Sequence, residues 1–373
     1  MRGKGLRFFF IALMLGLPLL VLFPRQTGRP IQNLQPVYDN TYSANLERYV
    51  ADGFPIADQL RQIRVDLKRL GGQREYNGIF LSSEGLMKNI DPPIMATLTA
   101  NVDAVADFAE YCSELDRTVF LVLIPSASGV LTQNLPLYST TVNQRRVIED
   151  IYGQLIGRVS TINAHTVLSD HRNQYVYYRT EDNLTSYGGY LVYGEMASRM
   201  LGTEAPELGQ FNISYDMTGY YGDLYQSAPY RYVQPDILST YHFSAFRREY
   251  LVSHTQTGDH RVYHTLYPRQ ALELGNPMKL YLGGQSAMVN IRTTVSNNRR
   301  LLIFGDKTAL GYLPFLANHY QQITLIDLFH SENLYASVKP EDYNQILFAY
   351  GIESFTTTAN PSRARILIRE ANT

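Results

Sequence analysis

The chain has 373 residues, of which 45% are hydrophobic and 18% charged, and its formal net charge is −1. That length can bury the core of one large α/β domain or of two smaller ones. The near-neutral charge argues against a nucleic-acid binder, which would carry a basic stripe. The single cysteine, Cys112, excludes an internal disulfide and a thiolate metal cluster, and its apolar helical surroundings predict a core residue.

The N-terminus combines basic residues with an apolar run. Arg2, Lys4 and Arg7 precede FFFIALMLGLPLLVLF at 8–23, and no small-x-small cleavage site follows. By the positive-inside rule the basic head stays in the cytoplasm. The pattern predicts a signal anchor over 1–28, a single-pass membrane helix that leaves the rest of the chain outside the cytoplasm. A cleaved signal peptide is the alternative, and it gives the same compartment.

Further along the chain, a polar stalk and a juxtamembrane helix are expected over 29–75, with helical spacing from 45 to 70 and a stop at Gly71-Gly72. An α/β domain is expected over 76–350. Apolar runs predict strands at 118–124, 175–178, 299–305 and 323–327, and periodic segments predict helices at 101–115 (capped by Asn101), 143–159 and 185–201. This alternation predicts a three-layer α/β fold with a mostly parallel sheet.

Two segments depart from this alternation. Over 206–275 turns are frequent, no convincing helix is visible, and ten tyrosines fall between Tyr215 and Tyr267. We expect a β-rich insertion there, whose tyrosines either stack on sugar rings or line a half-exposed sheet. The last segment, 351–373, is expected to be a C-terminal strand or tail.

The ends of the predicted strands carry the chemistry, because sites in open α/β sheets lie at the carboxyl ends of strands. Three such ends stand out: Pro125–Ser128, Thr180–Thr185 and Gly305–Lys307. A Gly-Asp-Ser turn in this position is the nucleophile signature of SGNH hydrolases, since the turn aims backbone N–H groups at a developing oxyanion. Here the third residue is Lys307.

Short motifs follow one another along the chain: YNGIFL at 76–81, LIPS at 123–126, YYRT at 177–180, TSYG at 185–188, YGDLY at 221–225, PD at 235–236 and PFLANHY at 314–320. In this order they resemble the DHHW proteins of Gram-positive bacteria, which are SGNH-like and related to the alginate O-acetylation proteins. The likeness covers most of residues 45–350.

The resemblance implies which residues occupy the catalytic positions. The family signature Arg-Thr-Asp-His-His-Trp-Thr matches residues 179–185 without a gap, and the family Asp-Ser-Tyr matches residues 306–308. By analogy with the alginate proteins, the signature Asp and its second His would be triad members, placed before the Ser in chain order. The candidate site therefore consists of Glu181, Asp182, Asn183, Asp306, Lys307 and Thr308, with the signature Trp replaced by Leu184.

These replacements predict a loss of catalysis. Asn183 stands where the general base is expected, and an amide has no accessible proton equilibrium near neutral pH. Lys307 stands where the serine is expected, and an amine of ordinary pKa is protonated and not nucleophilic. An active enzyme would need other groups: Thr308 or Ser286 as a shifted nucleophile, and His242, His264 or His319 as a base.

Two structural roles are also open. Acidic and small polar residues before a helix accept its free N–H groups, so Asp182, Asn183 or Thr185 suits an N-cap. Lys307 would lie at the positive end of a helix dipole, which disfavours a cation. We therefore expect an ion pair between Lys307 and Glu181 or Asp182; the alternative is that Lys307 points into solvent.

The sequence thus predicts a membrane-anchored, extracytoplasmic pseudoenzyme with a binding or accessory role in modifying cell-envelope polysaccharide. The alternative is an active carbohydrate O-acetyltransferase or acetylesterase that uses non-standard residues. Expected partners are the membrane, a cell-envelope glycan or a membrane acyltransferase, and no nucleic acid. No metal-ligand spacing and no phosphate-binding Gly-rich loop is present, so no metal or cofactor is expected.

Overall fold

The computed structural model describes residues 57–371 apart from 246–247, 257–259 and 331–337. The predicted anchor and most of the stalk lie outside these residues. Within them, no helix has the length and apolar character that crossing a bilayer requires. The described residues divide into two compact units, one within 74–227 and 232–371, the other within 57–73 and 228–231.

The larger unit is built on an eight-stranded sheet of order β5-β4-β13-β11-β12-β10-β8-β9. Five neighbouring strands run parallel: β5 (Ser160–Ile162), β4 (Thr118–Ile124), β13 (Gln345–Gly351), β11 (Arg300–Gly305) and β12 (Gln322–Ile326). The antiparallel strands are β10 (Met288–Thr293), β8 (Tyr250–Thr255) and β9 (Val262–Tyr263). The prediction of a mostly parallel sheet in an α/β fold is confirmed.

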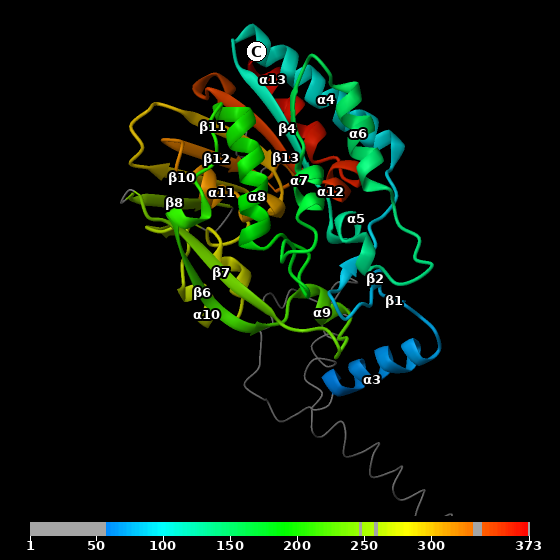
Figure 1. The fold of residues 1–373 in the computed structure, drawn as a ribbon. Helices are drawn as coiled ribbons and strands as arrows, with labels where there is room; N and C mark the ends of the chain where they lie inside the picture. The colour runs from blue at the N-terminus through cyan, green and yellow to red at the C-terminus, as the bar shows by residue number, and fades with distance from the viewer. Residues whose placement is uncertain (1–56, 246–247, 257–259, 331–337, 372–373) are drawn as a thin grey trace, which may run out of the picture. The chain divides into compact units, whose positions relative to one another are not determined.

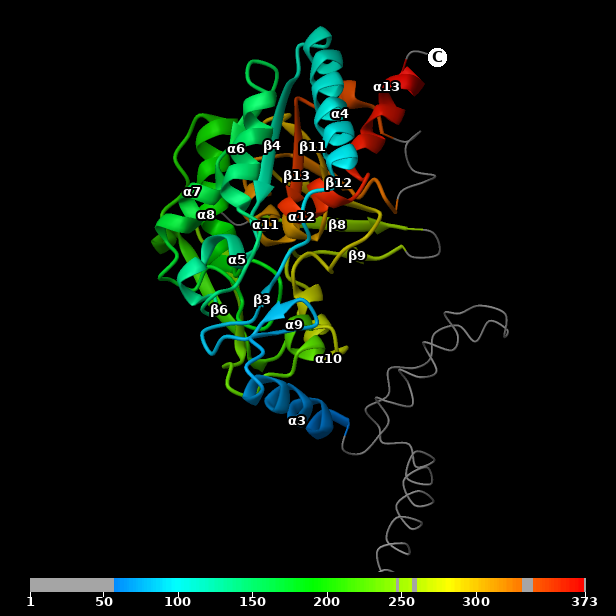
Figure 2. The ribbon, with the colours of Figure 1, turned by 90° about the vertical axis from the view of Figure 1, so that its right-hand side faces the viewer.

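Two hydrophobic clusters lie on opposite faces of this sheet. In β4, Val119, Leu121 and Leu123 belong to one cluster, whereas Phe120, Val122 and Ile124 belong to the other, as the two-residue period of a strand requires. One face is covered by α4 (Met95–Glu114), α6 (Gln144–Gln154), α12 (Ile352–Thr357) and α13 (Arg365–Ala371). The other is covered by α7 (Ala164–Asp170), α8 (Ser186–Met196) and α11 (Leu313–Leu316) (Figures 1 and 2). The strands are buried on both sides, which explains their continuous apolar sequences.

Smaller elements complete this unit. A three-stranded sheet consists of β1 (Glu75–Tyr76), β2 (Ile79–Phe80) and β3 (Met87–Lys88), and a two-stranded ribbon of β6 (Phe211–Tyr220) and β7 (Asp236–Phe243). Short helices are α5 (Ala127–Val130), α9 (Asp223–Ser227), α10 (Gln270–Glu273) and the 3₁₀ helix η5 (Lys307–Gly311).

The segment 206–275 contains the strands β6, β7, β8 and β9, in line with its expected β-rich character, but they do not form one separate sheet. Only β6 and β7 form a separate ribbon, whereas β8 and β9 extend the main sheet through β10. The tyrosine-rich composition does not reveal this difference, because edge strands of a large sheet and strands of a separate ribbon can have the same amino-acid composition. The two short helices α9 and α10 also lie in this segment.

Three further expectations differ from the structure. Residues 175–178 form no strand but only a bridge between Tyr177 and Leu184. There Thr185 N–H donates to Val176 O at 3.0 Å, so the chain pairs with itself. Asn101 does not cap a helix but lies buried inside α4, where its amide donates to Phe355 O at 2.7 Å. The expected C-terminal strand or tail at 351–373 contains helices α12 and α13, and the preceding strand β13 was not predicted.

The smaller unit contains α3 (Ala57–Leu70). The helix stops at the predicted glycines, where Gly71 N–H donates to Leu67 O at 3.0 Å and Gly72 N–H to Arg69 O at 2.9 Å. The part of the predicted helix before residue 57 lies outside the described residues.

Helix α8 offers a matched pair of glycines that tests its packing. A Cβ on Gly189 would lie 2.1 Å from the Gly311 carbonyl oxygen, whereas a Cβ on Gly194 would meet nothing within 4 Å. Gly189→Ala is expected to destabilise the protein by at least about 2 kcal/mol, because backbone must move. Gly194→Ala should leave stability unchanged or raise it by up to about 1 kcal/mol. Urea denaturation measures both, and equal effects would refute the close contact.

Candidate functional site

The candidate site lies at the carboxyl ends of the parallel strands. Strand β11 ends at Gly305, next to Ala349 of β13, and β13 ends at Gly351, next to Ile124 of β4. Because parallel neighbours end at the same edge, the residues that follow them are brought together. The prediction of three strand ends at one edge holds for β4 and β11, while the third segment reaches the edge as a turn.

Asp306 joins two of these strand ends. Its Oδ1 accepts hydrogen bonds from Thr308 N–H at 2.9 Å and from the Thr308 hydroxyl at 2.6 Å, which caps the start of η5. Its Oδ2 accepts from Gly351 N–H at 2.9 Å. Burial raises the pKa of Asp306, and these hydrogen bonds oppose the rise. Both oxygens are thus occupied by structural contacts.

The turn that carries the signature residues is held by a second buried carboxylate, Asp236. It accepts hydrogen bonds from Arg179 N–H at 2.7 Å, from Thr180 N–H at 2.8 Å, from the Tyr175 hydroxyl at 2.5 Å and from the Thr180 hydroxyl. Thr180 in turn accepts from Gly222 N–H through its Oγ1 and from Leu224 N–H through its carbonyl. Thr185, one of the predicted caps, is the N-cap of α8 and accepts from Gly188 N–H at 3.1 Å.

Glu181 is buried in this turn and its oxygens have defined partners. Oε1 accepts from the Asn183 amide at 3.0 Å, and Oε2 accepts from the Tyr220 hydroxyl at 3.1 Å and from Asp223 N–H at 3.0 Å. A Cβ on Gly222 would lie 2.6 Å from Glu181 Oε2, so a side chain there would displace the carboxylate. Burial raises the pKa of Glu181, partly offset by the Asp223 N–H bond. The structure therefore contains a carboxylate–amide pair.

Asp182 belongs to a group of charges at the same edge. Burial raises the pKa of Asp182; the positive charges of Lys307 and Lys88 lower it, and the negative charges of Glu353 and Asp306 raise it. Lys88 and Glu353 form an ion pair with 2.5 Å between Nζ and Oε2. This pair joins β3 to α12 and was not foreseen from the sequence, because 265 residues separate its members.

Lys307 is brought to this group, but its side chain is exposed. Its charge lowers the pKa of both Glu181 and Asp182. In the described part of the chain, however, no ion-pair contact joins its amine to either carboxylate. The expected contact is thus replaced by longer-range attraction, and solvation of the amine removes the need for a close partner.

The other candidate groups do not pair with one another: within the described residues, no hydrogen bond joins Ser286 to His242, His264 or His319. Ser286 is 4% exposed and donates to Thr255 O at 3.4 Å. His319 follows α11 at the amino ends of β11 and β12, where Asn297 donates to its carbonyl. Burial lowers the pKa of His319 to about 4, and its ring contacts the Tyr193 hydroxyl at 2.5 Å. His242 contacts Thr240, and His264 is exposed.

Sequence reasoning missed a polar network beneath the site. The Gln144 side chain accepts from Ser126 N–H at 2.8 Å and donates to the Ser126 hydroxyl at 2.7 Å, while the Ser128 hydroxyl donates to Lys88 O at 2.7 Å. It fixes the segment after β4 against β3. The only signal was the two serines after Pro125, because Gln144 falls in an ordinary helical pattern.

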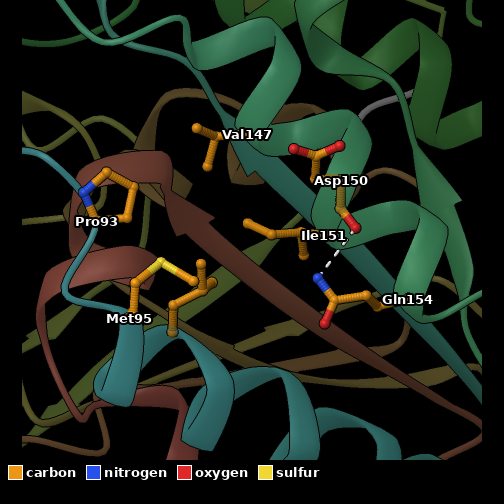
Figure 3. Close-up of a pocket in the computed structure, with 7 residues that line it drawn as sticks. Pro93, Met95, Val147, Asp150, Ile151 and Gln154 are labelled. Carbon is orange, nitrogen blue, oxygen red and sulfur yellow. Dashed lines mark hydrogen bonds between the residues drawn. The ribbon is translucent and has the colours of Figure 1, made fainter.

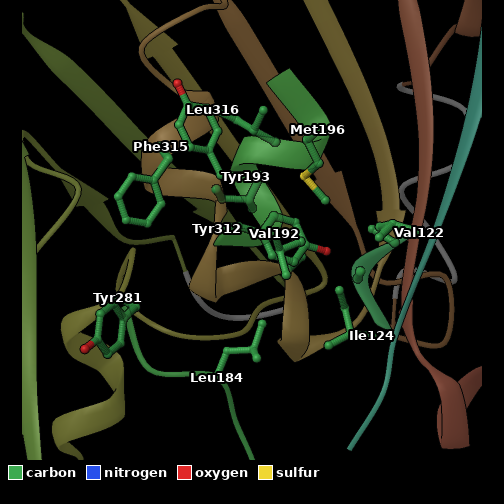
Figure 4. Close-up of a cluster of buried hydrophobic side chains, with 14 of the residues drawn as sticks. Val122, Ile124, Leu184, Val192, Tyr193, Met196, Tyr281, Tyr312, Phe315 and Leu316 are labelled. Carbon is green, nitrogen blue, oxygen red and sulfur yellow. The ribbon is translucent and has the colours of Figure 1, made fainter. Parts of the chain in front are cut away.

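Leu184, in the position of the signature Trp, points into the core below the site. It is 6% exposed and belongs to the same cluster as Val192, Tyr193 and Tyr312 (Figure 4). A hollow of about 460 Å³ lies elsewhere, between the start of α4 and α6 (Figure 3). Its lining is mainly apolar, with Met95 and Ile151 among its residues, and it contains none of the candidate site residues.

Comparison with known families matches residues 97–326 to the model of the DHHW protein family. A DHHW family protein from Eubacterium siraeum is similar in structure, with 19% identity, a TM-score of 0.56, and coverage of 77% of this chain and 97% of that one. PatB1 of Bacillus cereus, determined with a sulfonyl adduct, has 16% identity, a TM-score of 0.62 and coverages of 75% and 96%.

A third similar structure is the O-acetyltransferase domain of Pseudomonas putida AlgJ, with 11% identity, a TM-score of 0.50 and coverages of 79% and 99%. At these identities the likenesses show a shared fold. A search of curated proteins found no match.

The Asp236 carboxylate is expected to be essential for stability. Asp236→Asn replaces one acceptor oxygen with a donor that faces N–H and O–H groups, leaving buried donors unsatisfied. We expect a loss of about 2–5 kcal/mol of unfolding free energy, measured by urea denaturation. Tyr175→Phe, the control, removes one of the donors to Asp236 and should cost only about 1 kcal/mol. Equal costs for the two variants would contradict this account.

Proposed function

Because the chain belongs to the DHHW family, we propose that it is a catalytically inactive member with a binding or accessory role in modifying cell-envelope polysaccharide. We further propose that its N-terminal apolar run anchors it in the cell membrane, with the α/β domain on the extracytoplasmic side. The observation that carries the proposal of inactivity is the hydrogen bond from the Asn183 amide to Glu181.

That hydrogen bond is the contact by which a triad carboxylate would orient an imidazole. An amide can be oriented in the same way, but it cannot take a proton from a nucleophile. Lys307 follows β11 where the nucleophile is expected and offers an ammonium group to solvent. Removing the nucleophile or the base from a serine triad lowers kcat by roughly 10⁶, so loss of both leaves no ordinary route for acyl transfer.

A binding role remains compatible with what surrounds these positions. The edge presents carboxylates and ammonium groups, notably Asp182 and the Lys88–Glu353 pair, which suit the hydroxyl groups of a sugar. Tyr221 is 37% exposed, and its ring lies 4.2 Å from that of Tyr225, next to the Glu181 contact of Tyr220. Such rings can stack on a sugar face. The partner we propose is a cell-envelope glycan, or the membrane acyltransferase that modifies it.

One observation favours the alternative, an active O-acetyltransferase or acetylesterase with non-standard residues. The Thr308 hydroxyl donates to Asp306 at 2.6 Å, and a carboxylate in this position is able to accept a proton from an attacking hydroxyl. The same carboxylate also accepts Thr308 N–H, an ordinary helix-capping arrangement. We therefore rank this alternative second.

Acetyl-ester turnover and fluorophosphonate labelling of the purified full chain separate the two proposals. We expect the unmodified protein to give background turnover and no labelling, while it still binds cell-envelope glycan. The double variant Asn183→His/Lys307→Ser should gain labelling, because it supplies an imidazole beside Glu181 and the hydroxyl that position 307 lacks. Each single variant serves as a matched control and should stay silent.

Turnover by the unmodified chain that disappears in Thr308→Ala, but not in Ser286→Ala, would establish the alternative. A chain that neither turns over acetyl esters nor retains any glycan would contradict the proposed binding role.

A further inference from the structure

Helix α3 carries a stripe of exposed apolar side chains. Its members are Leu60 (48% exposed), Ile63 (52%), Leu67 (63%) and Leu70 (82%). Their spacing of three, four and three residues places all of them on one face of the helix. We call this face the α3 stripe. A soluble surface seldom leaves four large apolar residues aligned in this way.

The opposite face of α3 is already occupied within its own unit. Val65 is fully buried there, and the Arg69 guanidinium lies 5.4 Å from the centre of the Tyr230 ring. Asp66, at the flank of the stripe away from Arg64, forms an ion pair with Arg231 at 3.1 Å. The helix is therefore fixed by one side. The α3 stripe is the side that the described residues leave exposed.

Cations flank the stripe on one side. Arg64 is exposed and lies next to Leu60 and Leu67 on the helix surface. Lys68 is half-buried and lies one turn further along, on the same side as Arg64. Long basic side chains beside an apolar face can reach the headgroups of a bilayer while the apolar residues enter it. This chemistry favours anionic phospholipids over a neutral protein surface.

The chain itself brings such a surface near. The apolar run at 8–23 precedes α3 by residues 24–56. Whatever conformation these residues adopt, they can separate the run from α3 by no more than about 120 Å. If the run is inserted in a membrane, the bilayer is present at high effective concentration, so four apolar side chains suffice for contact.

We propose that the α3 stripe lies in the interface of an anionic phospholipid bilayer, on the extracytoplasmic side. This proposal rests on the membrane anchoring proposed above, but not on the loss of catalysis. Its consequence is that the membrane contacts the protein at a second place, so the protein is held by two contacts instead of one tether.

The test uses the full chain reconstituted into phosphatidylcholine vesicles with and without phosphatidylglycerol. Leu67→Cys is labelled with an environment-sensitive fluorophore, and Leu137→Cys, at a side chain that is 85% exposed, is the matched control. The native Cys112 is buried and should not react. We expect a blue shift and quenching by nitroxide-labelled lipid at position 67 only, enhanced by phosphatidylglycerol and reduced by Arg64→Gln/Lys68→Gln.

The possible failures are distinguishable. Protein that floats with vesicles while the label at position 67 stays accessible to an aqueous quencher overturns the role of the α3 stripe and leaves the anchor intact. A blue shift without lipid quenching means that protein covers the stripe, which also overturns it. Protein that does not float overturns the anchor and this proposal together, whereas esterase activity bears only on the proposed function.

Discussion

The buried carboxylate of Asp236 is the contact on which the candidate site depends. It accepts hydrogen bonds from the backbone of Arg179 and Thr180 and from two hydroxyl groups, and Thr180 then binds the backbone of the segment at 222–225. A buried charge without these donors would be costly, so the Asp236 contacts favour the arrangement that brings the three segments together. The positions of residues 181–183 follow from this assembly.

The hydrogen bonds that hold the turns of the candidate site in place therefore do not depend on the side chains at positions 183 and 307. Neither Asp236 nor Asp306 uses the side chain of residue 183 or 307 as a partner. The side chains at positions 183 and 307 can therefore differ without removing any of these contacts of Asp236 and Asp306. This separation explains how a complete α/β fold, similar to that of the Pseudomonas putida AlgJ domain, coexists with a carboxylate–amide pair.

The parts of the fold that were predictable are those with continuous apolar sequence. Strands β4, β11 and β12 are buried on both faces, and their runs are unmistakable. The segment at 175–178, Tyr-Val-Tyr-Tyr, is also strand-like in sequence but pairs with its own continuation, which no local pattern reveals. For the site, the motifs located Glu181, Asn183 and Lys307, whereas the Asp236 contacts and the Lys88–Glu353 pair depend on residues far apart in sequence. For Lys307 the structure agrees with the alternative, a side chain in solvent, and not with the expected ion pair.

We propose that this α/β domain forms no covalent acyl intermediate. Intact-protein mass spectrometry of the full chain, quenched during incubation with an activated acetyl donor, tests it most directly. The account predicts a chain of unchanged mass at times when an active serine enzyme would be acetylated. An acetyl adduct that maps by fragmentation to Thr308, or to any residue at the carboxyl edge of the sheet, would contradict it.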